Sequence, residues 1–257
     1  MKNTILSEKD TQLIEKAILR GGWILDMQAL LAIFKEEYTT ASAYKRINLL
    51  SKAGWLKRIK KGLYLVIDSI TARSQISISL LSVANILMKE SYVSFAHALN
   101  YYNMFDQYAS TIVSITDKEN KKYIVDNYTF AFSKVKKSMY FGFSEKLVSG
   151  KLTRVADAEK ALIDYLYLDK SFGSASLVFE KLRDYHHELD LKKFQEYALR
   201  SDTTIQRELG LMLDELKLDS SLLYQATKHN RGTSHFTKDS KIFNAKWRLY
   251  YDDRIIG

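Results

Sequence analysis

The sequence contains no cysteine and no proline among its 257 residues. Without cysteine the chain has no disulfide, no thiolate metal ligand and no cysteine nucleophile, which fits a reducing compartment. Because proline is absent, the turns must be formed by glycine, asparagine, aspartate and serine. The sequence also lacks an apolar run of the roughly 18 residues that cross a membrane, and its start, MKNTILSEKD, has no apolar signal segment. We therefore expect a cytoplasmic protein with no membrane partner.

Positive charge is in excess along the chain. The 39 Lys and Arg residues outnumber the 30 Asp and Glu residues, which gives a formal net charge of +9. A surplus of this sign favours a polyanionic partner, such as nucleic acid, or an anionic surface. The apolar and charged fractions, 46% and 27%, are those of an ordinary globular protein whose length permits one large domain or two modest ones.

Hydrophobic periodicity in the first part of the chain predicts three helices followed by two strands. The predicted elements are a helix from Ser7 to Gly21, a helix over 27–34, a helix from Thr39 or Thr40 to Gly54, and strands over 55–59 and 63–67. Ser7 and Asp10 have the spacing of a capping box at the start of the first helix. The connection between the strands ends in Gly62, which suits the left-handed position of a bulged hairpin.

The third predicted helix and the hairpin form a strongly basic segment. Seven Lys or Arg residues and no acid lie between Lys45 and Lys61. Ala43, Ile47 and Leu50 share one face of the helix, which would pack on the first two helices and leave the polar face free. Helix, helix, helix, strand, strand is the order of a winged helix-turn-helix, in which such a helix enters the major groove of DNA.

This pattern predicts a DNA-binding surface. Side chains near the start of the third helix would reach base edges, and the hairpin would contact phosphates or the minor groove. The residues that we assign to the surface are Thr40, Ser42, Tyr44, Lys45, Arg46, Asn48, Lys52, Lys57, Arg58, Lys60 and Lys61. The alternative is a protein-interaction module whose lysines are merely solvated. The charge lies on the two elements that would touch a duplex, and this favours DNA.

The rest of the chain predicts a larger second domain. Residues 68–75 are short and polar and mark the boundary, which gives a DNA-binding domain over 1–70 and a second domain over 76–257. The pattern indicates helices over 76–88 and 95–102, strands over 111–115, 123–132, 139–143 and 152–155, and helices over 157–169, 173–184, 190–199, 203–217 and 219–228. The expected fold class is α+β: a winged helix-turn-helix followed by a mixed α/β domain with a small antiparallel sheet and C-terminal helices.

No combination of residues indicates an enzyme. Asp157, Glu159 and Asp164 have no nearby histidine, cysteine or glycine loop that would complete a site. We expect Asp157 to cap a helix, and Lys160 and Asp164 to form an i,i+4 pair on the surface of that helix. His97 is expected to be a partly buried helix residue, and no histidine has acidic companions at ligand spacing. We therefore expect no catalytic residue, no cofactor and no metal.

Two further stretches carry excess positive charge. Lys134, Lys136 and Lys137 lie together at the end of a predicted strand. Residues 228–257 hold seven Lys or Arg residues, interleaved with Trp247 and Tyr250. Each stretch is either a second surface for nucleic acid, DNA or RNA, or an ordinary solvated face.

Three segments of the chain resemble a known family. They are GWLKRIKKGLYLV at 54–66, SYVSFAHALNYYNMFD at 91–106, and LTRVADAEKALIDYLY at 152–167, the last preceded by YTFAFSKV and MYFGF. Their order and spacing are similar to those of the AbiEi-type antitoxins of abortive-infection toxin–antitoxin systems. The resemblance covers residues 10–167 and continues more loosely thereafter. Ala158 stands where this family often has a proline before the Glu-Lys pair.

The resemblance implies a bacterial antitoxin of type IV that acts in phage defence. It implies a transcriptional repressor that binds inverted repeats in its own promoter, and a nucleotidyltransferase-like toxin that it counteracts without a stable complex. We expect a monomer in solution that pairs on double-stranded DNA, with antitoxic activity in the second domain. One alternative is a winged-helix regulator whose second domain senses a ligand, with no toxin. Another is an enzyme that acts on nucleic acid.

Overall fold

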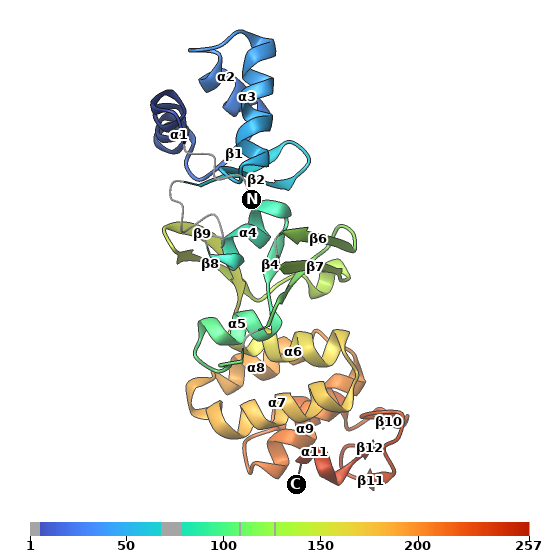
Figure 1. Ribbon diagram of the computed structural model, residues 1–257. Helices are drawn as coiled ribbons and strands as arrows, with labels where there is room; N and C mark the ends of the chain where they lie inside the picture. Colours follow the sequence, from blue (N-terminus) through green and yellow to red (C-terminus); the bar gives the residue numbers. More distant parts are fainter. Residues whose placement is uncertain (1–5, 68–78, 108, 126, 257) are drawn as a thin grey trace.

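The computed structural model describes residues 6–67, 79–107, 109–125 and 127–256. Its elements lie in successive layers along an elongated molecule, with the first helices at one end and the C-terminal helices at the other (Figure 1). A six-stranded sheet lies between them. The α+β class is confirmed, but the sheet is larger than predicted and is mixed rather than antiparallel.

The N-terminal unit, residues 6–67, combines helices with a three-stranded antiparallel sheet. Its elements are α1 (Glu8–Gly21), β1 (Ile24–Asp26), α2 (Met27–Phe34), α3 (Thr40–Lys52), β2 (Leu56–Lys60) and β3 (Leu63–Val66). The three predicted helices and the hairpin are confirmed. Strand β1, which pairs with β3, is not among the predicted elements because three residues are too few to show an alternating pattern. The predicted boundary, 68–75, lies outside the described residues.

The central sheet has the strand order β6-β7-β5-β4-β9-β8. Its strands are β4 (Ser91–Val93), β5 (Thr111–Thr116), β6 (Lys121–Val125), β7 (Tyr128–Lys134), β8 (Phe143–Val148) and β9 (Lys151–Ala156). The pairs β5–β7 and β4–β9 are parallel, and the other pairs are antiparallel. The helices that precede and follow β4 in the chain are α4 (Leu80–Leu87) and α5 (Phe95–Tyr101).

Two predicted strands are wrong in their bounds. The single strand predicted over 123–132 is the antiparallel hairpin β6–β7, with Asn127 in the turn. Apolar residues on both sides of this turn resemble one continuous run. The strand predicted over 139–143 is instead a 3-10 turn, η2 (Lys137–Met139), followed by Gly142 with a φ of 71°. The positive φ breaks the extended chain before β8 begins.

The segment that follows the central sheet is mainly helical. They are α6 (Ala158–Leu168), α7 (Phe172–Tyr185), the 3-10 turn η3 (His186–Glu188), α8 (Leu191–Ala198), α9 (Thr203–Glu215), α10 (Ser221–Thr227) and α11 (Asp253–Ile256). The five predicted helices, α6 to α10, are confirmed to within a few residues. The last stretch also forms a small sheet with strand order β10-β12-β11, which is not among the predicted elements. Its strands are β10 (Ser234–His235), β11 (Ile242–Asn244) and β12 (Leu249–Tyr251).

Trp247 attaches this small sheet to α9. Its side chain is 1% exposed, and its indole nitrogen donates a hydrogen bond of 2.7 Å to Asp214. The ring lies directly over Gly210, where an added Cβ would be 2.1 Å from the nearest ring atom. Only glycine leaves room for this approach. The small sheet therefore has a fixed position on the helical layer.

The N-terminal unit shares its hydrophobic core with the central sheet. Buried residues of α1, α2, α3 and the β2–β3 hairpin form one cluster with Val83 and Leu87 of α4 and with Ile112, Phe130 and Phe132 of the sheet. A second cluster, which includes Tyr92, Ile115 and Val155 of the sheet, joins the sheet to the C-terminal helices. Apolar packing therefore sets the orientation of the N-terminal unit on the sheet.

The pair formed by Lys160 and Asp164 is buried, and the prediction that it lies on the helix surface is wrong. Both side chains are 0% exposed. The carboxylate of Asp164 also accepts hydrogen bonds from the hydroxyls of Ser94, at 2.7 Å, and Tyr92, at 3.2 Å. The ammonium of Lys160 lies 5.0 Å from the centre of the Phe141 ring. The i,i+4 spacing fixes the pair on one side of α6, but it does not reveal that β4 covers that side.

We expect Asp164→Ala to lower the free energy of unfolding by roughly 3–5 kcal/mol, because the change leaves the Lys160 ammonium buried without a counter-charge. The double variant Lys160→Met, Asp164→Leu should recover part of this loss. Recovery is incomplete because the hydroxyls of Ser94 and Tyr92 lose their acceptor. Urea unfolding followed by circular dichroism measures both effects. A double variant no more stable than the single one would contradict this account of the pair.

Candidate nucleic-acid interface

Helix α3 presents a polar face to solvent. The Thr39 hydroxyl caps its start by accepting a hydrogen bond of 3.4 Å from the backbone nitrogen of Ser42. Ala43, Ile47 and Leu50 are buried, as their spacing predicts. The assigned residues that are exposed on this helix are Thr40, Ser42, Tyr44, Lys45, Asn48 and Lys52. The exposed face therefore combines hydroxyl and amide groups with two ammonium groups.

The β2–β3 hairpin follows α3 directly and packs against it (Figure 1). The register shifts between Arg58 and Lys60, and Gly62 has a φ of 76°, which confirms the predicted bulged turn. Arg58 and Lys61 are exposed, and Lys57 is half-buried. The bulge and the turn thus place two cations in solvent beside α3.

Lys60 is held by the neighbouring layer. Its ammonium donates hydrogen bonds to the backbone carbonyls of Leu87, at 3.0 Å, and Ile86, at 3.5 Å, at the end of α4. Unpaired carbonyls and the helix dipole favour a cation at this end. Burial lowers the pKa of Lys60, and the nearby charges of Lys121 and Lys89 lower it further. In this structure Lys60 ties the hairpin to α4 and does not project toward a ligand.

Arg46 is also engaged inside the protein. Two nitrogens of its guanidinium donate hydrogen bonds to the Asp10 carboxylate, and one of them, Nε, lies 2.6 Å from Oδ1. The Asp10 carboxylate is buried and accepts hydrogen bonds from the hydroxyl and backbone nitrogen of Ser7, which confirms the capping box. Burial alone would raise the pKa of Asp10, but the hydrogen bonds from Arg46 and Ser7 outweigh burial and hold the pKa below its ordinary value. Arg46 therefore fixes α3 on α1.

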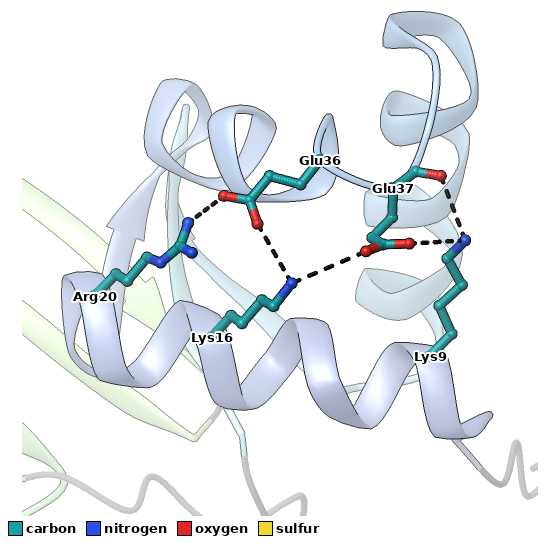
Figure 2. A network of polar contacts seen from close by, with 5 residues as sticks. All are labelled: Lys9, Lys16, Arg20, Glu36 and Glu37. Atoms are coloured by element: carbon teal, nitrogen blue, oxygen red, sulfur yellow. Dashed lines mark hydrogen bonds and ion pairs between the residues drawn. The ribbon is translucent and has the colours of Figure 1, made fainter.

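The cations of α1 have acidic partners after α2, as Figure 2 shows. Lys9 lies 3.1 Å from Glu37, Lys16 lies 3.3 Å from Glu36, and Arg20 also pairs with Glu36. Exposed pairs of this kind stabilise a fold by only about 0–1 kcal/mol each. Their larger effect is on the charge distribution, because they leave α1 nearly neutral on that side.

Four of the assigned cations are exposed and have no acidic partner within the described residues: Lys45, Lys52, Arg58 and Lys61. Two of them lie on α3 and two on the hairpin that packs against it. The structure thus places four of the seven cations of the segment in solvent, while Arg46 and Lys60 hold the fold. Such cations can neutralise phosphates without breaking an ion pair of the described structure.

The second basic surface predicted from the sequence lies elsewhere. Lys134 ends β7, Lys136 follows it, and Lys137 begins η2. All three side chains are exposed, and none has an acidic partner in the ranges that the structure describes. The backbone nitrogen of Lys134 donates a hydrogen bond of 2.7 Å to the side chain of Asn120, which fixes the end of the strand.

A hollow of about 290 Å³ lies between α4, α5 and the segment that follows α5. Its lining residues are Ser79, Leu80, Leu81, Ala96, His97, Asn100, Asp106, Gln107 and Ala109. His97 is partly buried, as predicted. Burial lowers the pKa of His97, against a hydrogen bond with the Ala109 backbone that raises it, so the imidazole is neutral at pH 7. Its volume lies at the lower end of the range for small-molecule sites.

The acids of α6 have structural partners. Asp157 is the N-cap residue, as predicted, but its carboxylate accepts a hydrogen bond of 2.9 Å from the Tyr197 hydroxyl instead of capping the helix. Glu159 pairs with Lys193 at 2.9 Å. In the described ranges, no group of three or more His, Asp or Glu residues is placed to hold a metal ion. No helix in the described part of the chain is long and apolar enough to cross a membrane.

Comparison with known proteins identifies a similar fold and no family. No protein-family model matches the sequence, and no curated protein sequence matches it. The structure is similar to the crystal structure of the Rv2827c protein from Mycobacterium tuberculosis, with a TM-score of 0.65 and 12% sequence identity. The match covers 95% of this chain and 92% of that chain. At this identity the likeness establishes the fold over nearly the whole length.

We expect Arg46→Ala to lower the free energy of unfolding by about 2 kcal/mol at pH 7, because a buried carboxylate loses its charged hydrogen bonds. The folded-state pKa of Asp10 is depressed, so its contribution is present above the ordinary carboxyl pKa and is lost as pH falls through the depressed value. The difference in the free energy of unfolding between wild type and variant should therefore become smaller as the pH is lowered. Urea unfolding at a series of pH values measures it.

Lys16→Ala, in the network of Figure 2, is the matched control and should change stability by less than about 1 kcal/mol. Arg46→Lys should fall between wild type and Arg46→Ala, since an ammonium restores the charge but not the two-nitrogen grip. A loss for Arg46→Ala that is the same at every pH would count against the pairing with Asp10.

Proposed function

We propose that this protein is a DNA-binding antitoxin of a type IV toxin–antitoxin system that represses its own operon. The observation that carries the proposal is the group of four exposed cations without acidic partners, Lys45, Lys52, Arg58 and Lys61. They lie on two adjacent elements of a unit whose order, helix, strand, helix, helix, strand, strand, is that of a winged helix-turn-helix.

In the proposed complex, the start of α3 enters the major groove. Ser42, Lys45 and Asn48 face the base edges, where hydroxyl, ammonium and amide groups meet the donors and acceptors of the bases. Lys52 and the hairpin cations meet phosphates and set the orientation of the helix. Two copies on an inverted repeat occlude the promoter, and transcription of both antitoxin and toxin genes stops.

The toxin part of the proposal rests on the resemblance to AbiEi-type antitoxins. By that resemblance, the neighbouring gene encodes a nucleotidyltransferase-like toxin, which this protein counteracts without forming a stable complex. Antitoxic activity is assigned to the residues after the N-terminal unit. A role without catalysis agrees with the acids of α6, each of which is engaged by a neighbouring side chain.

Replacing Lys45 and Lys52 by alanine, or Arg58 and Lys61 by alanine, should weaken binding to a duplex carrying the upstream promoter. Loss of Arg58 and Lys61 should also reduce the slope of log affinity against log salt by about 2, and loss of Lys45 and Lys52 by about 1, because each lost phosphate contact removes about 1 and Lys45 faces the bases. Fluorescence anisotropy over a salt series measures both quantities. Changes at Lys45 should in addition alter the preference for the promoter over an unrelated duplex.

The matched control for these variants is Lys9→Ala with Lys16→Ala. It removes the same charge from the same unit, but from α1, where both lysines have acidic partners. The control should keep a slope close to that of wild type. If all three double variants lost the same affinity, net charge alone would explain binding, and the assigned surface would be wrong.

Co-expression with the product of the downstream gene separates repression from antitoxicity. A full-length variant with all four cations changed should release the promoter and still prevent growth arrest. Point variants suit this test better than deletion of residues 1–75, because the deletion would expose the apolar core that the N-terminal unit shares with the central sheet. A variant that still repressed the promoter would contradict the assignment of the DNA surface.

The hollow beside His97 favours a second candidate function, a regulator that senses a small ligand and has no toxin partner. A downstream gene that encodes no nucleotidyltransferase would favour this candidate. Ala96→Trp, which fills the hollow, should then abolish any effect of the ligand on promoter binding without changing the basal affinity.

A further inference from the structure

Three aromatic rings lie in a row across the small C-terminal sheet. His235 of β10 and Phe243 of β11 are both register partners of Tyr250 on the central strand β12. The His235 and Tyr250 rings are stacked, with centroids 4.5 Å apart and planes 11° apart. The Phe243 ring lies 4.9 Å from Tyr250 at 45°. Cross-strand pairs on one face of the sheet thus bring together side chains that are distant in sequence.

The row faces solvent. Phe243 is 45% exposed, His235 is exposed and Tyr250 is half-buried. The neighbouring positions Ser234 and Leu249 are buried, and Trp247 anchors the sheet to α9. Because β10 and β11 are the edge strands, His235 and Phe243 are the two ends of the row, and neither has another described ring beyond it.

The segment that contains the row is rich in Lys and Arg, and Asp252 and Asp253 follow it directly. Residues 228–248 contain six Lys or Arg residues and one acid, Asp239. Lys246 pairs with Asp214 outside this segment, and the guanidinium of Arg248 donates to the backbone carbonyls of Arg231 and Gly232. The cations of the segment that are exposed without an acidic partner in the described ranges are Lys228, Arg231, Lys238 and Lys241.

A buried cation lies next to the small sheet. Arg207 of α9 is 2% exposed, and its guanidinium donates only to neutral groups, among them the Ser234 hydroxyl at 3.1 Å and the Asn230 carbonyl at 2.8 Å. These bonds hold the segment before β10 in place. No acid pairs with Arg207 in the described residues, so its charge adds to that of the exposed cations.

We propose that this surface binds single-stranded nucleic acid. An unpaired base stacks on the outer face of Phe243 and extends the row by one ring, and the flanking phosphates meet the cations of the segment. Every base has a face that can stack in this way, whereas the bases of a duplex are already stacked on one another. The site lies in the C-terminal layer, at the opposite end of the molecule from α3 (Figure 1), and does not depend on the proposed duplex binding.

A row of rings could instead serve only to hold three short strands together. The two roles differ in what they require at position 243. Packing requires apolar volume, which leucine supplies, whereas stacking requires a flat π-face, which leucine lacks and tryptophan enlarges. Phe243→Leu and Phe243→Trp therefore separate the roles, and the exposure of the side chain keeps the cost to the fold small.

The test is fluorescence anisotropy of the full-length protein with three labelled probes of one sequence: a single-stranded RNA of 12 nucleotides, the same sequence as single-stranded DNA, and its DNA duplex. Phe243→Leu should weaken binding of the single-stranded probes about tenfold, and Phe243→Trp should retain it. Neither change should affect the duplex. Tyr101→Leu, which alters an exposed ring on α5, is the matched control and should leave all three affinities unchanged.

Binding of RNA alone, of DNA alone or of both identifies the natural strand, and each of these results supports the site. The log of the affinity should also fall linearly with the log of the salt concentration, with a slope of about 0.7 per contacted phosphate. Absence of single-strand binding by the wild-type protein would overturn the proposal, as would equal affinities for wild type, Phe243→Leu and Tyr101→Leu. Circular dichroism of each variant shows that the comparison is between folded proteins.

Discussion

The apolar core shared by the N-terminal unit and the central sheet is the contact on which the arrangement of the protein depends. Buried side chains from α1, α2, α3 and the hairpin continue without a break into α4 and the strands around Phe130. Because the inner face of the hairpin is covered there, Lys60 meets the end of α4, while Arg58 and Lys61 remain in solvent. The same packing that stabilises the fold thus selects which hairpin cations can meet a ligand.

Charge compensation then divides the basic residues into two roles. Arg46 satisfies a buried carboxylate, Lys9 and Lys16 meet the acids after α2, and Lys60 meets backbone carbonyls. The exposed cations of the N-terminal unit that have no acidic partner in the described residues are the four on α3 and the hairpin, together with Lys35 at the end of α2. A net charge of +9 therefore says less about partners than the positions at which that charge has no internal partner. The same reasoning distinguishes the C-terminal segment, which carries both the stacked rings and exposed cations without described acidic partners.

Sequence patterns predicted the helices and the first hairpin well and the later strands less well, since β8, with six residues, was not predicted. A period of 3.6 residues and signals such as Ser7 and Gly62 were sufficient for the helices and the bulged hairpin. Strands of two or three residues show no period, so β1, β4 and the small C-terminal sheet were absent from the prediction. For the candidate site, composition identified the basic segment but not the partner of Arg46, which lies 36 residues away in the chain. Burial of Lys160 likewise depends on a strand that is distant in sequence.

The most direct test of the central claim, that α3 and the hairpin contact duplex DNA, is site-specific photo-crosslinking. A photoreactive residue is placed at Lys45, at Lys61 or at Lys9 of the full-length protein, and each variant is irradiated with a duplex of the upstream promoter. The account predicts a covalent protein–DNA adduct from positions 45 and 61 and none from position 9, whose side chain faces Glu37. Crosslinking from position 9 without crosslinking from 45 and 61 would contradict it.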